Sequence, residues 1–486
     1  MIIQSKWKYI SISLIIFLIP FLDFLKSNID EIDIILGKSF YFLIFSLLSI
    51  LFITSLSINY IFKKKDFYKV LLSVFLTYWV LFKHNSLKII IKSLLENFDT
   101  ILTEYNSEIS LLLLIILSIY LSIGIFRNNQ LFNRFIFIFF FLTFFTYIFP
   151  IISFIYQSNI LKSDKVNYLN YPDNLNKTKE NIYFFILDGM QPIKEFEQHY
   201  KVDLDDFLHH TKNKNFHYFN NTSNIYDNTT HTLSAFFYLD KIFNNKKELK
   251  EKKNILFPTI LREENKSDLL NNLFNLGYDF KWVGNFFAYC PKFNLRYCLN
   301  KNQSSLIDSY LYINFFRQSP IIPIVVNLGL IFNFNFDKYF FYELNNGMGR
   351  LTDFLKQGKF NDKPTFFFIH HMSPHWPYIT NEDCSFKKYP GKKNFDGYKS
   401  AYLCNIKKVM ETIDFLHEFD PNSTIVFQSD HNWTMSKNKE EKKKIFNLMK
   451  IDESCRFDEN IIMHNVNTLR LILSCMTGNN PDYIVN

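Results

Sequence analysis

The distribution of apolar residues divides the chain into two parts. In the first third, long apolar stretches alternate with short polar ones, and most approach the roughly 20 residues that a helix needs to cross a bilayer. Pro20 and Asp23 stand where a removable signal peptide would have small residues, so the first stretch is interpreted as an anchor. Residues 1–156 are predicted to form a transmembrane region of about five helices. The candidate spans are residues 9–25, 40–62, 70–82, 109–126 and 135–156, of which the third is the shortest.

Basic residues beside these stretches predict their orientation. Lys6 and Lys8 precede the first stretch, three lysines at 63–65 follow the second, and Arg127 and Arg134 separate the last two. These segments are expected in the cytoplasm. An odd number of spans then places everything after residue 156 outside the cytoplasm. If the third stretch does not cross, the compartment of the C-terminal part changes.

A different pattern follows a polar segment, residues 157–180, which we interpret as a linker. Continuous runs of apolar, β-branched and aromatic residues predict strands that are buried on both faces. Between these runs the apolar spacing is helical, most clearly where Ser267 offers a cap and Gly277 a stop. This alternation predicts an α/β domain with a central, mostly parallel sheet over residues 181–486. The predicted strands are 181–187, 278–283, 364–371 and 423–428, and further predicted helices are 192–200, 402–419 and 466–476.

Charge and cysteine content narrow the class of protein. The chain has 486 residues and a formal net charge of +8 that is spread along it, so nucleic-acid binding is not predicted. All six cysteines lie in the C-terminal part, as expected for a domain that matures in an oxidising compartment. None shows the C-x-x-C spacing of a zinc site. Sequential pairing is the simplest connectivity, and six unrelated thiols are the alternative. Sequential pairing predicts the disulfides Cys290–Cys298, Cys384–Cys404 and Cys455–Cys475.

Residues with metal-ligand chemistry directly follow two predicted strands. Asp188 ends the first strand, and Asp430 and His431 end a late one. Open α/β sheets bind ligands just outside the carboxyl ends of their strands, so these side chains are expected to lie close together. Carboxylate and imidazole ligands suit a divalent metal of the Zn²⁺ or Mn²⁺ type.

A hydroxyl-rich stretch, residues 226–234, runs into apolar residues in the manner of a helix start. A threonine hydroxyl that binds a metal ion at a helix N-terminus can attack phosphorus and form a covalent intermediate. Capping of the helix by threonine and serine is the structural alternative.

Three histidines, His370, His371 and His375, lie at and just past the end of another predicted strand. Pro374 and Pro377 constrain the loop that carries the last of them. Imidazolium donors at this position can hold an anionic oxygen or protonate a leaving group.

The order of these motifs resembles the alkaline phosphatase superfamily. Within it, the chain is most similar to the membrane-anchored sulfatase-like group that includes phosphoethanolamine and phosphoglycerol transferases and lipoteichoic acid synthases. The resemblance covers residues from about 181 to the C-terminus, and several helices before an extracytoplasmic catalytic domain also fit it. In chain order the motifs are Ile-Leu-Asp188-Gly189, Thr229-x-x-Thr232-Leu, Gly277-Tyr278 with Trp282 and Asn285, His371-x-x-Pro374-His375-x-Pro377 and Ser429-Asp430-His431.

The resemblance implies roles for individual residues. The nucleophile would be Thr229 and not Thr230, because the family pattern places a second hydroxyl three residues after the nucleophile, followed by leucine. The metal ligands would be Asp188, Thr229, Asp430 and His431. The residues that contact the substrate would be His371, His375 and Asn285.

The chain also departs from the family pattern. Several of the transferases have glutamate where Asp188 stands, and most members have glycine where this chain has Asn432. These changes are compatible with a metal site whose ligand side chains have a different length, and also with a site that has lost its metal. Sulfatases proper need a Cys-x-Pro-x-Arg type motif, whereas the nearest stretch here, Cys290-Pro291-Lys292, is in the wrong register and far from the first strand. Sulfate ester hydrolysis by that route is therefore disfavoured.

These observations predict a multi-pass enzyme of the bacterial inner membrane with a sulfatase-like catalytic domain in the periplasm. Its expected activity is transfer of a phosphoethanolamine or phosphoglycerol type headgroup from a phospholipid donor to a cell-envelope glycan or lipid acceptor, through a threonine-linked intermediate. A hydrolase of envelope esters and a non-catalytic member of the fold are the alternatives. A transporter is disfavoured because the spans hold few ionisable residues.

Overall fold

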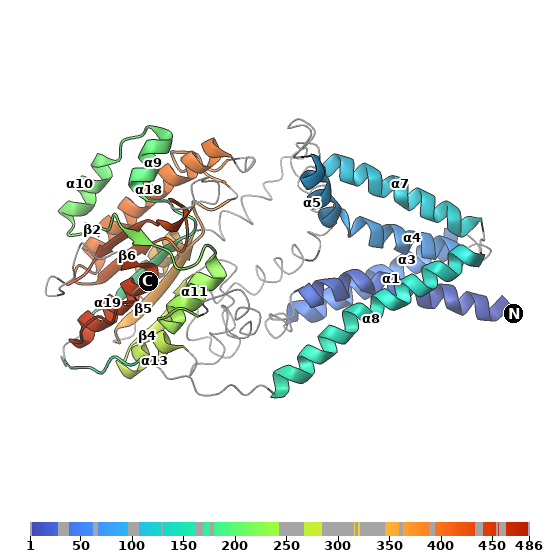
Figure 1. Ribbon diagram of the computed structural model, residues 1–486, viewed down its shortest axis with the longest axis horizontal. Coiled ribbons are helices and arrows are strands. Elements are labelled where there is room, and N and C mark those ends of the chain that lie inside the picture. The colour runs from blue at the N-terminus through green and yellow to red at the C-terminus, as the bar shows by residue number, and fades with distance from the viewer. Residues whose placement is uncertain are drawn as a thin grey trace. The chain divides into compact units, whose positions relative to one another are not determined.

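The computed structural model places the chain in two compact units, Met1–Asp164 with Ser304–Phe334, and Lys165–Gln303 with Asn335–Asn486. Figure 1 shows the helices of the first unit and the sheet and helices of the second. The structure describes residues 2–27, 38–61, 67–95, 106–127, 130–160, 169–174, 179–242, 267–283, 315, 319–320, 346–358, 363–376, 378–387, 394–432, 441–452, 455 and 463–484.

The first unit is helical in all of its described elements. Each of the five predicted spans falls on a helix, and α5, which was not predicted, continues α4 after a short turn. The helices are α1 (Ile2–Ser27), α3 (Lys38–Ile61), α4 (Phe67–Leu81), α5 (His84–Leu95), α7 (Asn106–Phe126) and α8 (Gln130–Ile160).

Length and hydropathy support fewer crossings than the sequence predicts. Among the described residues, one helix is long and apolar enough to span a membrane, over Ile109–Phe126 with a mean hydropathy of 2.7. The helices Phe67–Leu81 and His84–Ile91 are bent by 45° at their junction, and together they are long and apolar enough to form a second span. The other apolar helices, Phe45–Ile58 and Ile136–Ile152, are shorter. The five-span arrangement and its orientation therefore stay predictions.

One ion pair joins two of these helical segments. Lys83, at the break between α4 and α5, places its Nζ atom 2.9 Å from Oδ2 of Asp23 near the end of α1. The same ammonium lies 6.0 Å from the ring centres of Trp79 and Tyr147. Two opposite charges within apolar helices thus neutralise each other, with aromatic faces around them.

The second unit is built on a six-stranded sheet in the order β2-β7-β6-β1-β5-β4. The pairs β6–β1, β1–β5 and β5–β4 are parallel, whereas β7 pairs antiparallel with β6, and β2 pairs antiparallel with β7 at the edge of the sheet. The prediction of a mostly parallel sheet is confirmed. The strands are β1 (Ile182–Leu187), β2 (His217–Tyr218), β4 (Asp279–Val283), β5 (Thr365–His371), β6 (Thr424–Gln428) and β7 (Asn447–Lys450), with β3 (Thr222–Ser223) and β8 (Met463–His464) in a separate pair.

Helices cover both faces of this sheet (Figure 1). Along β1, every second residue enters one core, where Phe184 packs 5.8 Å from Phe236 and 5.7 Å from Phe368. The residues between them enter the other core, where Phe185 stacks 4.4 Å from Phe427. This two-sided burial explains the continuous apolar run. One face carries α11 (Thr229–Tyr238), α13 (Asp268–Asn275) and α19 (Asn465–Thr477), and the other α9 (Ile193–Tyr200), α10 (Asp205–Asn213), α17 (Gly347–Lys356) and α18 (Phe395–Phe419).

Local signals in the sequence fix several helix ends. Ser267 caps α13 by accepting a hydrogen bond from the Leu270 amide at 3.1 Å. Gly277, just beyond the end of that helix, has a φ of +82°, a conformation that glycine adopts without steric cost. The helix predicted over 402–419 begins earlier, at Phe395, because Asn394 caps its start. The helices predicted over 192–200 and 466–476 are confirmed as α9 and α19.

Two of the three predicted cysteine pairs lie at disulfide distance. Cys384 pairs with Cys404 and Cys455 with Cys475, with Cα atoms 4.9 and 5.4 Å apart. The predicted Cys290–Cys298 pair lies outside the described residues. The paired cysteines agree with the expectation of an oxidising compartment for this unit.

Candidate metal centre

The alternation of side chains along three neighbouring strands positions the candidate centre. Ile186 of β1 lies in register with His370 of β5 and Gln428 of β6. Side chains two residues apart on a strand share a face, so Asp188 follows Ile186 on the face covered by α11 and α19. Asp430, two residues beyond Gln428, follows the same rule. The sequence therefore places Asp188, His370 and Asp430 on one face at the carboxyl end of the parallel strands.

These three residues form a compact, buried cluster. Each offers a ligand atom within 4.8 Å of the ligand atoms of the other two. Nε2 of His370 lies 3.5 Å from Oδ2 of Asp188. The two carboxylates are almost completely buried, with 1% of Asp188 and 0% of Asp430 exposed to solvent. Burial of two carboxylates side by side is costly unless positive charge compensates them.

The oxygen atoms that face the cluster fit a cation. Within the described part of the chain, neither Oδ1 of Asp188 nor Oδ2 of Asp430 receives a well-formed hydrogen bond. Nε2 of His431 lies near both, at 3.4 and 3.6 Å respectively. Buried carboxylate oxygens without such a bond are uncommon in proteins. Carboxylate oxygens and imidazole nitrogens in this number are the ligands that divalent zinc and manganese prefer.

His431 is held in the orientation that a metal ligand requires. Its Nδ1 lies 2.8 Å from the carbonyl oxygen of Asn432, which can only accept a hydrogen bond. Nδ1 therefore carries the proton when the ring is neutral, and the lone pair of Nε2 points to the cluster. A carbonyl acceptor on the far nitrogen is the usual support of a metal-bound histidine.

Thr229 brings a hydroxyl to the same place. It is the first residue of α11, and its Oγ1 lies 3.3 Å from Nε2 of His431. The helix is capped by Asn228, whose side chain accepts from the amide of His231, so Thr229 is not the cap. Thr232 is buried, and its hydroxyl donates to the carbonyl of Tyr226. Of the two threonines in the family pattern, Thr229 is the one beside the cluster.

The charges of the cluster act on each other. Burial raises the pKa of Asp188, but His375, His370 and His431 together hold it well below its usual range. Burial and the adjacent Asp188 charge raise the pKa of Asp430. Burial opposes the charging of His431, yet Asp430 and Asp188 raise its pKa to about 10. The centre therefore needs positive charge to ionise both carboxylates, and a divalent cation would supply it.

His375 lies at the edge of the cluster. Its ring centre is 6.3 Å from that of His431, and its side chain is half-buried. Gly189 lies between the two rings with a φ of +70°, where a Cβ would come within 3.6 Å of His431 and 3.8 Å of His375. The Gly189 amide donates to Oδ1 of Asp430 at 3.1 Å. The turn after Asp188 thus brings its backbone close to both histidines.

Of the residues with a predicted substrate role, His371 is not part of this arrangement. His371 follows His370 in β5 and lies on the opposite face, where it accepts from the Met348 amide at 3.5 Å. Burial lowers the pKa of His371 well below its usual value. Its position does not support contact with a substrate at the cluster. Asn285 lies outside the described residues.

The motif order passed over His370, which the structure places in the cluster. The sequence presents the three histidines of this stretch as one group, although neighbouring residues of a strand face opposite sides. Phe368 and His370 are two residues apart and share a face of the sheet, as Ile186 and Asp188 do. The same alternation predicts that His370 and His371 lie on opposite faces.

Asn432, the departure from the family pattern, has a structural role away from the cluster. Its amide donates to the carbonyl oxygens of Glu441 at 2.6 Å and Lys444 at 2.7 Å. It therefore joins the strand end that carries Asp430 to the segment 441–444. The side chain of Asn432 is thus engaged with backbone groups, and it takes no ligand position.

The comparisons with known proteins give matches among solved structures. No family model matches the sequence, and no curated protein matches it. The C-terminal periplasmic domain of EcEptC from Escherichia coli, in complex with Zn, matches with 15% identity over 65% of this chain and 88% of that chain, with a TM-score of 0.41. The integral membrane protein lipooligosaccharide phosphoethanolamine transferase A (EptA) from Neisseria meningitidis matches with 12% identity over 96% of this chain and 95% of that chain, with a TM-score of 0.44.

A third solved structure is also similar to this chain. The putative sulfatase yidJ from Bacteroides fragilis matches with 13% identity over 62% of this chain and 76% of that chain, with a TM-score of 0.39. These three solved structures thus include a protein named as a phosphoethanolamine transferase and one named as a putative sulfatase.

Proposed function

We propose that this protein is a metal-dependent enzyme that transfers a phospho-linked headgroup, of the phosphoethanolamine or phosphoglycerol type, from a phospholipid to a glycan or lipid acceptor of the cell envelope. The observation that carries the proposal is the position of Thr229. Its hydroxyl oxygen lies 3.3 Å from Nε2 of His431, beside the buried cluster and at the first residue of α11. A hydroxyl in this setting has the surroundings of an activated nucleophile.

The residues around Thr229 fit a divalent metal, Zn²⁺ or Mn²⁺. Asp188, His370, Asp430 and His431 would hold it, with the Thr229 hydroxyl as a further ligand. When bound, such a cation lowers the pKa of a coordinated hydroxyl and stabilises negative charge on phosphoryl oxygens. His370 enters this set from the structure, in addition to the four ligands that the motif resemblance implies.

The reaction proceeds in two displacements at phosphorus. In the first, Oγ1 of Thr229 forms a bond to phosphorus and the bond to the diacylglycerol oxygen breaks. Thr229 then carries the headgroup phosphate, and diacylglycerol leaves after its oxygen has gained a proton. In the second, an acceptor hydroxyl forms the new bond to phosphorus, and Thr229 is released and regains its proton. Atoms and charge balance without a further reactant.

We assign to His375 an assisting role in both displacements. It lies at the edge of the cluster, 6.3 Å between ring centres from His431, and is half-buried. From there an imidazolium can donate a hydrogen bond to a phosphoryl oxygen and give a proton to the leaving oxygen. The N-terminus of α11 adds backbone amides, which favour an anionic group near Thr229.

The membrane helices suit a lipid donor, because a phospholipid is confined to the bilayer surface. We propose that the protein resides in the bacterial inner membrane with this unit on the periplasmic side, as the basic residues beside the spans and the paired cysteines suggest. Hydrolysis is the same chemistry with water in place of the acceptor hydroxyl. The nature of the second product separates a transferase from a phosphodiesterase.

Mass spectrometry of the purified full chain after incubation with phosphatidylethanolamine and phosphatidylglycerol vesicles tests this proposal. A headgroup phosphate adduct is expected on Thr229, and it should be absent in Thr229→Ala. Thr230→Ala, one residue further in the same helical turn, is the matched control and should retain the adduct. An adduct that survives in Thr229→Ala, or no adduct in protein with bound metal, would contradict the assignment of the nucleophile.

A further inference from the structure

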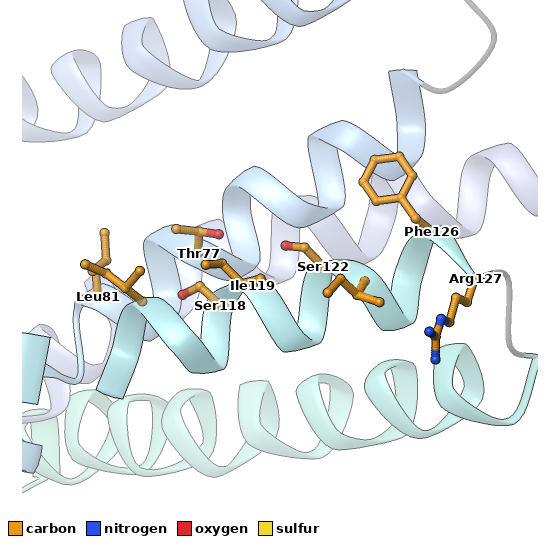
Figure 2. Close-up of a pocket in the computed structure, with 9 residues that line it drawn as sticks. Thr77, Leu81, Ser118, Ile119, Ser122, Phe126 and Arg127 are labelled. Atoms are coloured by element: carbon orange, nitrogen blue, oxygen red, sulfur yellow. The ribbon is translucent and has the colours of Figure 1, made fainter. Parts of the chain in front are cut away.

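A groove runs along α7 in the helical unit, far in the sequence from the metal centre. It has a volume of about 590 Å³, which is within the usual range for small-molecule sites. Figure 2 shows Leu81 at one end of the groove and Phe126 and Arg127 at the other. The wall opposite α7 comes from α4, through Thr77 and Leu81.

The sequence of α7 explains the shape of the groove. Residues four apart form ridges on a helix surface. One ridge is Ile115, Ile119 and Ile123, followed at the same spacing by Arg127 just beyond the helix. The neighbouring ridge carries Ser118 and Ser122, whose small side chains leave a shallow floor beside the isoleucines. A long, narrow and mostly apolar channel results.

The exposure of α7 indicates that lipid reaches this channel. The stretch Ile109–Phe126 is long and apolar enough to span a membrane, and 22% of it is buried inside the protein. Ile119 is 56% exposed and Ile123 is 47% exposed, although both belong to the groove. In a bilayer these side chains contact acyl chains and not water.

The dimensions fit one acyl chain of a single leaflet. From Ile115 to Arg127 the helix axis rises about 18 Å, at about 1.5 Å per residue. One leaflet provides half of a hydrocarbon core of about 30 Å. A chain that fills the groove from the bilayer midplane therefore ends with its glycerol phosphate at the level of Arg127.

Arg127 supplies the charge that a phosphate needs. Its side chain is exposed, and within the described part of the chain no acidic residue forms an ion pair with it. Guanidinium groups bind phosphate oxygens in a bidentate manner. From the apolar channel and this terminal arginine we infer that the groove between α4 and α7 binds an anionic glycerophospholipid, with one acyl chain along Ile115, Ile119 and Ile123 and the phosphate on Arg127.

This lipid is distinct from the donor of the proposed reaction. The predicted orientation places Arg127 at the cytoplasmic surface, whereas the metal centre is expected on the periplasmic side. The groove would therefore hold a lipid of the cytoplasmic leaflet. Its binding does not depend on the chemistry at Thr229.

Photolabelling of the full chain in nanodiscs tests the inference. The probe is phosphatidylglycerol with a diazirine near the end of one acyl chain, diluted into phosphatidylcholine, and the labelled residues are identified by mass spectrometry. Labelling of Ile115 and Ile119, at the end of the groove away from Arg127, is expected to exceed that of Ile116 and Tyr120 at least fivefold. Ile116 and Tyr120 are the comparison because they are 54% and 70% exposed on the same helix but do not line the groove.

Two variants separate the phosphate contact from the channel. Arg127→Gln and Ser122→Leu should each reduce groove labelling several-fold, the first by removing the charge and the second by filling the floor. Arg134→Gln is the matched control, since Arg134 is exposed near the same end of the unit and does not line the groove. It should label as the native chain does.

Uniform labelling around α7, unchanged labelling in Arg127→Gln, or cross-links to a second copy of the chain in place of lipid would overturn the inference. Thr229→Ala should label normally, so that a failure of the proposed reaction and a failure of the groove are told apart. Uncharged diacylglycerol added in excess should not compete with the probe, whereas unlabelled phosphatidylglycerol should.

Discussion

His370 and His371 are consecutive residues of β5, yet their imidazoles lie on opposite faces of the sheet. His370 joins the cluster, with Nε2 3.5 Å from Asp188, whereas His371 accepts a hydrogen bond from the Met348 amide. Because strand residues alternate between faces, the two histidines cannot serve the same site. The structure thus separates two side chains that the sequence presents as a pair.

The first prediction follows from this separation. His370→Ala should lower the metal content of the purified chain by tenfold or more at limiting metal, because it removes a candidate ligand from a buried site. His371→Gln should leave the metal content unchanged. The measurement is the metal-to-protein ratio by inductively coupled plasma mass spectrometry after dialysis. Equal losses in both variants would show that the effect comes from damage to the sheet.

Asp430→Asn should change stability with opposite sign in the two metal states. Without metal, the variant is expected to melt at a higher temperature than the native chain, since it removes one of two adjacent buried carboxylates. With metal at about 100 times its dissociation constant, the native chain gains about 2.7 kcal/mol from binding, and the variant should gain much less. The order of the two melting temperatures should therefore reverse on addition of Zn²⁺. The same order in both states would argue against a cation between these carboxylates.

Asn432→Gly restores the residue that most members of the resembled family carry. It should not raise metal binding, because the Asn432 side chain bonds to the carbonyls of Glu441 and Lys444 and not to the cluster. Loss of these two bonds should destabilise the protein by about 1–3 kcal/mol. Thermal melting of the chain gives the stability, and the metal-to-protein ratio gives the occupancy. A gain in metal content in Asn432→Gly would instead mark this position as part of a weakened site.

Asp268 gives a pH dependence of known sign. Burial raises its pKa to about 6, above the value of about 3.9 in an unfolded chain. The folded state therefore holds this proton more tightly, so its stabilising contribution is present below about pH 4 and is lost as the pH rises through about 6. Asp268→Asn mimics the protonated form, and it should be more stable than the native chain at pH 7. Melting curves between pH 4 and pH 7 should converge at the acidic end, and a constant difference would contradict the assignment.

The central strands were predictable because their signal is strong. The six residues of β1 are all buried, and the run contains no polar positions. An amphipathic helix or a strand with one exposed face would need such positions. The positions of Asp188 and Asp430, two of the candidate ligands, were also predictable, since both residues follow such runs directly. That Thr229 lies beside His431 could not be derived from the sequence, because it depends on where α11 meets the sheet.

The elements that the sequence did not predict have weaker signals. The short strands β2 and β7 have two and four residues, and β7 becomes a strand through antiparallel pairing with β6. Helix α5 begins at His84, with two residues between it and the end of α4, and its sequence is less apolar than that of α4. His370 was passed over because motif order compares positions along the chain and ignores the face on which each side chain lies.

The Asp23–Lys83 ion pair has a consequence for biosynthesis. The two residues are 60 positions apart, so at about 5–20 residues per second Lys83 emerges about 3–12 s after Asp23. If the first helix spans the bilayer as the sequence predicts, it carries an uncompensated carboxylate into an apolar environment during that interval. Insertion of α4, the third predicted span, would bring Lys83 to this carboxylate. The first helix is therefore expected to stay near the translocation machinery until α4 has been inserted. The pair would thus time the release of the early helices into the lipid.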